Sequence, residues 1–319
     1  MNRKIGILTS GGDAPGMNDV IRAAVYFGIN KGFEMYGIID GYKGLVEGKI
    51  KRLTKADVDQ IETRGGTILR TARLPEFKNL EVQKKGAENL KNLGIDALLV
   101  VGGDGSYMGA KALSDLGICC VTLPGTIDND ISSSDITIGF DTALNTIVNA
   151  IDQIKDTGRS HERCMVVEVM GNHCDDLALY AGIANCADIV ISRNHMVSKE
   201  DVVKELQTKK DAGQEFALVV VSEKIIDLNE LIKYIQENAT WDTRGTVLGH
   251  IQRGGTPTAM ERVNAVRMTN YAIDLIEKNI SSVCIGIKDG EVVHQDIIEA
   301  LKSKSKSSAE LIKIIDEMK

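Results

Sequence analysis

Carboxylates, hydroxyls and glycines follow two apolar runs in the middle of the chain. Residues 97–101 lead into Gly-Gly-Asp-Gly-Ser (102–106), and residues 119–123 lead into Pro-Gly-Thr-Ile-Asp-Asn-Asp (124–130). In an open α/β sheet, the side chains that serve ligands lie just beyond the carboxyl ends of parallel strands. Glycines let backbone N–H groups approach a phosphate, and carboxylates hold the divalent cation that accompanies it. The two segments therefore predict a site for phosphoryl transfer.

A glycine-rich turn near the N-terminus offers a second place for an anion. Residues 9–18 read Thr-Ser-Gly-Gly-Asp-Ala-Pro-Gly-Met-Asn, after an apolar run and before a helical pattern. Free N–H groups at the start of a helix attract anions. The segment lacks both the Gly-x-Gly-x-x-Gly spacing and the Walker lysine, so a merely tight turn is an equal alternative when it is taken alone.

Arg73 is a candidate phosphate ligand. Pro75 biases Leu74 towards an extended backbone, which predicts a loop from which the Arg73 guanidinium can reach a phosphate. A solvated surface arginine is the alternative, because exposed charge is the usual state of this residue type.

A second basic segment spans residues 244–262. Arg244, His250 and Arg253 stand there among glycines, an arrangement that suits a sugar-phosphate dianion. A single histidine is more often structural, so His250 alone carries little weight.

Apolar runs alternate with amphipathic segments nearly throughout, which is typical of parallel α/β layering. Strands are predicted at 4–9, 35–39, 97–101, 119–123, 164–169, 188–191, 217–222 and 282–287. Helices are predicted at 17–31, 80–93, 106–116, 141–156, 199–211, 228–238, 259–278 and 308–318. The strand pattern changes near residue 139, which predicts one domain of residues 1–138 with about 253–305 and another of about 139–252 with 306–319.

The bulk composition limits the class of protein. A chain of 319 residues with 43% hydrophobic content can bury a sizeable core, and the net charge of −7 argues against a nucleic-acid surface. No apolar stretch approaches the roughly 20 residues that cross a bilayer. The first residues show no signal-peptide pattern, and the six cysteines show no metal or disulfide spacing, so a cytoplasmic protein is expected.

Taken together, these motifs resemble those of bacterial ATP-dependent 6-phosphofructokinases, in the same order and over essentially the whole chain. The resemblance implies two Rossmann-like three-layer α/β domains with mostly parallel sheets and the active site in the cleft between them. It also implies a glycolytic kinase that uses Mg2+ and ATP to phosphorylate fructose 6-phosphate, assembled as a homotetramer.

The resemblance also implies roles for individual residues, with Asp128 as the base that accepts the proton of the sugar 1-hydroxyl. The implied catalytic residues are Asp128, Arg73, Thr126 and Gly12. The implied ATP contacts are Gly12, Arg73, Leu74, Gly103, Asp104, Gly105 and Ser106, and the implied metal ligands are Asp104 and Asp130. The implied substrate contacts are Thr126, Asp128, Asp130, Arg163, Met170, Gly171, Glu223, Arg244, His250 and Arg253. Arg163 and Arg244 are expected to come from a neighbouring subunit.

Two glycines bear on the phosphoryl donor. Related pyrophosphate-dependent enzymes typically carry Asp where Gly105 stands and Lys where Gly125 stands. An Asp there would repel the α-phosphate of ATP, so both positions favour ATP. A pyrophosphate user or a related sugar-phosphate kinase is the alternative.

Other positions depart from the family pattern. Asn172 stands where Arg is usual, Asp175 where Gly is usual, and Lys224 where Gly is usual. Asn172 removes a cation beside the reacting phosphates and Asp175 adds a carboxylate nearby, so weaker electrostatic stabilisation of the phosphates is predicted. A low-activity regulatory paralogue is therefore an alternative.

The implied allosteric site, for ADP or phosphoenolpyruvate, is also altered. Its basic positions fall on Arg22, Tyr26, Lys55, Lys155, Ala212, Gln214 and Glu215. Because several cations are missing, a phosphate-rich effector is expected to bind weakly.

Overall fold

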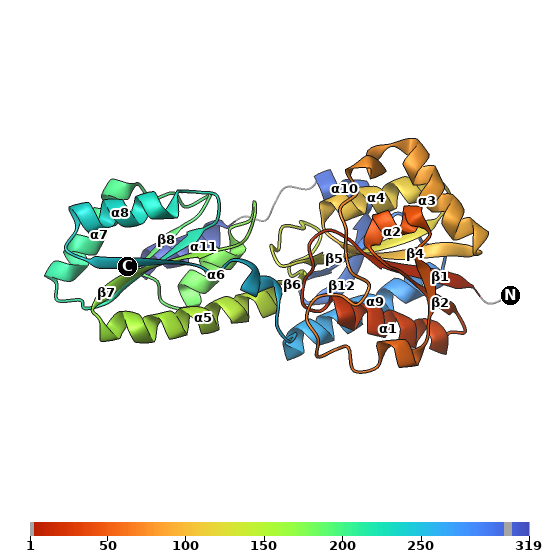
Figure 1. Ribbon diagram of the computed structural model, residues 1–319, viewed down its shortest axis with the longest axis horizontal. Coiled ribbons are helices and arrows are strands. Elements are labelled where there is room, and N and C mark those ends of the chain that lie inside the picture. Colours follow the sequence, from red (N-terminus) through yellow and green to blue (C-terminus); the bar gives the residue numbers. More distant parts are fainter. Residues whose placement is uncertain (1–2, 303–307, 319) are drawn as a thin grey trace. The chain divides into compact units, whose positions relative to one another are not determined.

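The computed structural model describes residues 3–302 and 308–318, and the chain divides into two units (Figure 1). Unit 1 comprises residues 1–142 and 253–305, and unit 2 comprises residues 143–252 and 306–319. The first division falls at Thr142 rather than at residue 138, because helix α5 (Phe140–Ser160) begins before it and runs on into unit 2. The division at 305 lies outside the described residues.

Unit 1 is built on an eight-stranded sheet. Its strands are β1 (Lys4–Thr9), β2 (Glu34–Ile38), β3 (Ile50–Leu53), β4 (Ile95–Gly102), β5 (Cys119–Thr126), β6 (Ile138–Gly139), β11 (Val283–Lys288) and β12 (Glu291–Asp296). They run in the order β12-β11-β5-β4-β1-β2-β3, with β6 beside β5. The β2–β3 and β11–β12 pairs are antiparallel, and the other pairs described are parallel. The predicted, mostly parallel α/β class is confirmed.

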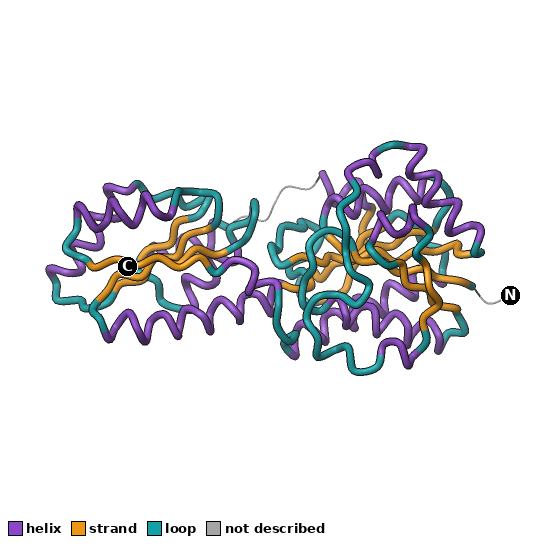
Figure 2. Tube along the Cα trace, viewed as in Figure 1, coloured by secondary structure: helices purple, strands orange, loops and turns teal. Residues whose placement is uncertain are grey.

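Helices cover both faces of this sheet (Figures 1 and 2). One face carries α1 (Met17–Asn30) and α9 (Ala259–Glu277), and the other carries α2 (Gly41–Glu47), α3 (Leu80–Asn92), α4 (Asp104–Asp115) and α10 (Ile297–Lys302). Short 3-10 helices lie at Lys55–Val58, Pro75–Lys78 and Gly249–Arg253. Because both faces are covered, β4 and β5 are buried along nearly their whole length, which explains their continuous apolar sequences.

The central strands of unit 1 position the predicted site. β5, β4 and β1 are neighbours, and their carboxyl ends lead into residues 126–130, 103–106 and 10–13 respectively. The loops approach closely, since Ser10 donates its N–H to the Val101 carbonyl over 2.9 Å. A Cβ on Gly102 would lie 2.4 Å from the Ser106 hydroxyl oxygen, so this position has no room for a larger residue.

Unit 2 holds a four-stranded parallel sheet in the order β10-β7-β9-β8. The strands are β7 (Arg163–Val169), β8 (Ile189–Ile191), β9 (Ala217–Ser222) and β10 (Asp242–Val247), and the helices besides α5 are α6 (Asp176–Ala184), α7 (Lys199–Asp211), α8 (Leu228–Asn238) and α11 (Ala309–Glu317). α7 and α8 pack with alternate residues of the strands in one apolar cluster. α5 and α6 pack on the other face, where Gly158 lies against Met165 and Gly182 against Val190.

Two buried carboxyls on helices of unit 1 predict a pH-dependent stability. Burial raises the pKa of Asp19 and of Glu261 to about 7, whereas both titrate near pH 4 in an unfolded chain. The folded protein therefore holds these protons where the unfolded chain has released them. Stability conferred by the protonated carboxyls is fully present below about pH 4 and is lost as the pH rises from about 4 to 7.

We expect Asp19→Asn to raise the free energy of unfolding at pH 8 by on the order of 3 kcal/mol, because the amide carries no charge to bury. The gain should shrink towards pH 5, and denaturant unfolding at both pH values measures it. Asp59→Asn, at an exposed position, is the matched control. An equal gain for Asp19→Asn at both pH values would contradict the argument.

Within residues 3–302 and 308–318, none of the helices combines the length and the apolar character that crossing a membrane requires.

Candidate active site

A pocket of about 1090 Å³ in unit 1 lies at the carboxyl ends of β1, β4 and β5. The residues expected there that line it are Gly12, Arg73, Leu74, Gly103, Asp104, Gly105, Ser106, Thr126, Asp128, Asp130 and Arg253. Every catalytic, ATP, metal or substrate residue that the sequence placed in this unit therefore lines one cavity, whereas the predicted effector residues Arg22 and Lys55 do not. The convergence follows from parallel pairing, which delivers the ends of neighbouring strands to the same edge of the sheet.

The turn after β1 approaches a guanidinium. A Cβ on Gly12 would lie 2.7 Å from Arg253 Nη1, so only glycine fits without displacing that arginine. Arg253 Nη1 also lies 3.8 Å from Asp13 Oδ1, and the arginine is only partly exposed. Gly12 and the Arg253 guanidinium thus lie together in the pocket lining, where a cation suits an anionic ligand.

The loop after β5 is fixed by its own hydrogen bonds. The Asp128 N–H donates to Thr126 Oγ1 over 3.1 Å, and the Thr126 carbonyl accepts from the Thr137 hydroxyl over 2.6 Å. Asn129 adopts a left-handed backbone conformation (φ 55°), and its amide oxygen accepts from the Thr137 N–H over 2.9 Å. The loop is therefore held in one conformation, with the half-buried Asp128 carboxylate at the pocket wall.

Two further carboxylates interact across the pocket. Desolvation raises the pKa of Asp104, and the negative charge of Asp130 raises it further. Such mutual repulsion is relieved when a cation lies close to both groups. Among the described residues, no cluster of three or more His, Cys, Asp or Glu side chains could hold a metal. A site of two carboxylates fits Mg2+, which is usually held by one or two carboxylates together with substrate phosphates.

The pocket also has an aromatic wall that the sequence analysis missed. Tyr42 and Phe77 stack with ring centroids 4.3 Å apart, and both line the cavity. The Tyr42 hydroxyl donates to the Ser106 carbonyl over 2.5 Å, so the wall also braces the glycine-rich turn. Phe77 lies four residues after Arg73, a predicted ligand, whereas Tyr42 lies in the short helix α2, where the sequence shows no motif.

In unit 2, the implied sugar contacts meet at the carboxyl ends of β7 and β9. Glu223 donates its N–H to the Val169 carbonyl over 2.8 Å, which places it beside Met170 and Gly171. Gln252, buried and not expected from the sequence, accepts the Met170 N–H over 3.0 Å. In the sequence, only the position of Gln252 between His250 and Arg253 pointed to it as a site residue. His250 itself is exposed on the short helix Gly249–Arg253.

Arg163 and Arg244 lie at the opposite end of the same sheet. Both guanidinium groups pair with Asp242, with 2.8 Å between Arg163 Nε and Asp242 Oδ2. Arg163 begins β7, and Arg244 is the third residue of β10, in register with Met165. The six residue steps from Arg163 to Val169 span roughly 20 Å. Within one chain, the structure does not bring the two arginines together with Glu223.

A sequence model of the family described as Phosphofructokinase matches residues 4–276. The chain belongs to the phosphofructokinase family. It is 49% identical, over the full length of both chains, to a protein of Vibrio vulnificus (strain YJ016) named ATP-dependent 6-phosphofructokinase. It is 48% identical to the protein of that name from Edwardsiella ictaluri (strain 93-146), over 95% of each chain.

Solved structures agree with this membership. Phosphofructokinase from Saccharomyces cerevisiae superposes with a TM-score of 0.89 at 35% identity, covering 99% of this chain and 47% of the yeast chain. A pyrophosphate-dependent phosphofructokinase from Marinobacter aquaeolei superposes with a TM-score of 0.87 at 16% identity, covering 96% of this chain and 86% of the other. The second likeness shows the shared fold alone.

Asp175, which stands where the family usually has Gly, has defined hydrogen-bond partners, and its effect on electrostatic stabilisation stays a prediction. Asp175 is buried, and its carboxylate oxygens accept the N–H groups of Arg193 and Asn194 over 2.9 Å each. Both oxygens of this carboxylate are therefore held by backbone N–H groups of the loop at 193–194. Asp176, beside it, is also buried, at the start of α6.

The basic residues expected at an allosteric site have partners of their own. In unit 1, Arg22 Nε lies 3.3 Å from Glu62 Oε2, and Lys55 Nζ donates to the Asn30 side chain over 2.8 Å. Both cations also lie over the Tyr26 ring, at 4.5 and 5.2 Å from its centroid.

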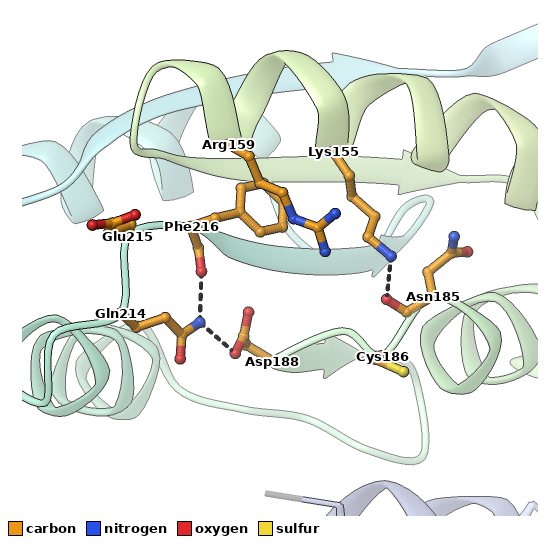
Figure 3. Close-up of a pocket in the computed structure, with 8 residues that line it drawn as sticks. All are labelled: Lys155, Arg159, Asn185, Cys186, Asp188, Gln214, Glu215 and Phe216. Carbon is orange, nitrogen blue, oxygen red and sulfur yellow. Dashed lines mark hydrogen bonds between the residues drawn. The ribbon is translucent and has the colours of Figure 1, made fainter.

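In unit 2, Lys155 lines a pocket of about 430 Å³ beneath α5 (Figure 3). Its ammonium donates to the Asn185 carbonyl over 3.0 Å. The Gln214 amide donates to Asp188 Oδ1 over 2.9 Å and to the Phe216 carbonyl over 2.6 Å. Lys155 Nζ also lies 3.6 Å from Asp152 Oδ1, and Asp188 Oδ1 lies 3.2 Å from Lys209 Nζ. The charges of Lys155 and Asp188 are therefore already paired, and Glu215 adds a negative charge to the lining.

Proposed function

We propose that this protein transfers the γ-phosphoryl group of ATP to the 1-hydroxyl of fructose 6-phosphate, giving fructose 1,6-bisphosphate. The observation that carries the proposal is that Gly12, Arg73, Asp104 and Asp128 line the same pocket in unit 1. The full-length relatives named ATP-dependent 6-phosphofructokinase support it. A glycolytic role in the cytoplasm is part of the same proposal.

In the proposed reaction, the sugar 1-oxygen attacks the γ-phosphorus, the bond from that phosphorus to the β–γ bridging oxygen breaks, and ADP leaves. Asp128 accepts the proton of the hydroxyl. A general base must be held near that proton, and the hydrogen bond from the Asp128 N–H to Thr126 Oγ1 fixes its loop. The Gly12 N–H and the Arg73 guanidinium stabilise charge on the transferring group. Asp104 and Asp130 would hold Mg2+, which neutralises phosphate charge when bound.

We assign ATP binding to unit 1 and most of the sugar contacts to unit 2, with Asp128 and Arg253 of unit 1 also serving the sugar. Met170, Gly171 and Glu223 would hold the sugar, with His250 and Arg253 also at its phosphate. Because Arg163 and Arg244 lie at the far end of the unit 2 sheet, they would have to serve the site of a second copy. The proposed assembly is a homotetramer, and at least a dimer is required.

Two glycines support ATP as the donor. No atom lies within 4 Å of a Cβ built on Gly105, so the space beside the glycine-rich turn is open for nucleotide phosphates. A Cβ on Gly125 would lie 2.8 Å from Val101 Cγ1 and 3.0 Å from Met17 Cε. A lysine there, as in the pyrophosphate users, would not fit without rearrangement.

A coupled assay on fructose 6-phosphate with ATP or pyrophosphate tests the proposal. Turnover with ATP and little with pyrophosphate is the expected result, and the reverse would overturn the donor assignment. Asn172, which replaces the usual arginine, favours a low-activity regulatory paralogue as the second candidate. A kcat far below 1 s⁻¹ would support that candidate, because typical enzymes turn over at about 1–1,000 s⁻¹.

We expect phosphoenolpyruvate to inhibit weakly and ADP to activate weakly. An effector shifts a two-state equilibrium only by its difference in affinity for the two states, and hydrogen bonds to charged groups are worth about 1.5–3 kcal/mol each. Here Tyr26, Ala212 and Gln214 supply no cation, Glu215 repels phosphate, and Lys155 is already bonded to Asn185.

The measurement is the half-saturating concentration of fructose 6-phosphate with and without millimolar phosphoenolpyruvate. A change of less than about twofold, which corresponds to about 0.4 kcal/mol, is expected. Glu215→Lys is the informative variant, since it should increase the inhibition by adding a cation to the pocket. A strong rise with sigmoidicity in the unmodified protein, reversed by ADP, would contradict the expectation.

A further inference from the structure

Lys224 occupies a backbone conformation that lysine rarely adopts. Its φ is 63°, in the left-handed region, directly after Glu223 and the end of β9. Asn172 has a φ of 53° in the loop after β7. A non-glycine residue in this region is strained, and such residues persist where the surrounding structure holds them. Asparagine tolerates this backbone conformation because its short polar side chain can form hydrogen bonds with the nearby backbone. The long side chain of lysine offers no such compensation.

The two residues are joined side chain to side chain. Lys224 Nζ donates to Asn172 Oδ1 over 3.1 Å, and it lies 3.8 Å from Glu223 Oε1. The Asn172 N–H donates to the same Glu223 oxygen over 3.0 Å. Because β7 and β9 are parallel neighbours, their following loops meet at one edge of the unit 2 sheet. Carboxylate, amide and ammonium therefore form one cluster there.

The contacts of Lys224 give little stability. Its side chain is 59% exposed, and an exposed ion pair contributes about 0–1 kcal/mol. An ammonium group has three donors, so the bond to Asn172 and the approach to Glu223 leave at least one for a ligand. The Lys224 ammonium is thus an accessible cation beside the proposed sugar site, and the positive φ of Lys224 strains the backbone there.

We propose that Lys224 is a catalytic residue whose ammonium contacts the phosphoryl group on the 1-oxygen of the sugar, and that Asn172 positions it. The inference rests on the proposed function, which places the sugar at Met170, Gly171 and Glu223. Lys224 forms and breaks no covalent bond. It stabilises negative charge on the phosphoryl group as that group joins the sugar oxygen, while the hydroxyl proton goes to Asp128.

Three substitutions at this position separate charge from structure. Lys224→Met keeps the stem and removes the charge, Lys224→Arg keeps the charge, and Lys224→Gly removes the side chain while suiting the backbone. Asn172→Gly removes the positioning oxygen at a position with a positive φ. The measurements are kcat, the KM for fructose 6-phosphate, product inhibition by fructose 1,6-bisphosphate, and the midpoint of thermal unfolding.

We expect Lys224→Met and Lys224→Gly to lower kcat by about 10- to 100-fold, while the KM for fructose 6-phosphate changes by less than about threefold. The inhibition constant for fructose 1,6-bisphosphate should rise about tenfold, because only the product carries the phosphoryl group that Lys224 contacts. Lys224→Arg should retain part of kcat, and Asn172→Gly should lose about 3- to 10-fold. Ethylamine should restore part of the activity of Lys224→Gly, whose unfolding midpoint should be no lower than that of the wild type.

The outcomes are distinguishable. If Lys224→Met keeps more than half of kcat and an unchanged inhibition constant for the bisphosphate, the Lys224 inference is wrong while the proposed function stands. If Lys224→Gly loses activity together with its unfolding midpoint and ethylamine restores nothing, the lysine is structural and the inference is also wrong. A wild-type protein without ATP-dependent phosphorylation of fructose 6-phosphate would overturn the proposed function itself.

Discussion

Asp128→Asn should lower kcat by about 100- to 10,000-fold, the usual range for removal of a general base. The amide keeps the shape of the side chain, and the hydrogen bond from the Asp128 N–H to Thr126 involves only the backbone of this residue. The loop should therefore remain folded. ATP binding should persist, because Gly12, Arg73 and the turn at 103–106 are unaltered. Steady-state kinetics and equilibrium titration with ATP measure the two effects separately.

Asp115→Asn is the matched control for this variant. Asp115 also lines the unit 1 pocket, where it pairs with Lys111, but it is the last residue of α4, whereas Asp104 is the first. The same carboxylate-to-amide change should leave kcat within about threefold there. An Asp128→Asn variant that keeps more than about half of the wild-type kcat would remove Asp128 from the role of base.

Gly105→Asp should lower kcat/KM for ATP by about 30- to 100-fold, equivalent to about 2–3 kcal/mol of repulsion. The position lies in the first turn of α4 with no atom within 4 Å of a built Cβ, so the new carboxylate fits and projects into open space beside the phosphates. The KM for fructose 6-phosphate should change less than about threefold, since most of the sugar contacts are assigned to unit 2.

Gly105→Ala separates size from charge in this test. A methyl group meets nothing in the same open space, so the kinetics with ATP should stay within a few-fold of the wild type. If Gly105→Asp leaves both the KM for ATP and kcat unchanged, the phosphates do not lie where we place them. A loss of equal size in the alanine variant would show that bulk rather than charge matters.

The buried parallel strands were the elements that the sequence predicted best. β4 and β5 are continuous apolar runs, because both of their faces are covered by helices. β10 and β12 escaped prediction, since both are edge strands with many polar residues and no continuous apolar run. α6 escaped it for the opposite reason: the helix is apolar on nearly every side, so it shows no helical periodicity.

The sequence predicted those residues of the candidate site that directly follow the ends of parallel strands. Gly12, Asp104 and Asp128 follow three neighbouring strands, so parallel pairing alone predicts that they meet. The engagement of Asp175 by the N–H groups of Arg193 and Asn194 could not be foreseen, because it depends on where a loop 18 residues away returns. Contacts of that kind arise from tertiary packing, and no local pattern encodes them.

The sheet order of unit 1 has a consequence for the growing chain on the ribosome. β5 carries the loop of Asp128, and its second neighbour is β11, which is synthesised only after residues 143–252. The same late segment braces the loop from outside, because Ile287 accepts the Asp135 N–H over 2.6 Å and donates its own to Ser134 over 2.9 Å. Until residue 288 emerges from the ribosome, β5 is an open edge that can pair with other chains. Premature termination in α9 should therefore yield an aggregating fragment rather than a weak kinase, although most of the pocket residues have already been made.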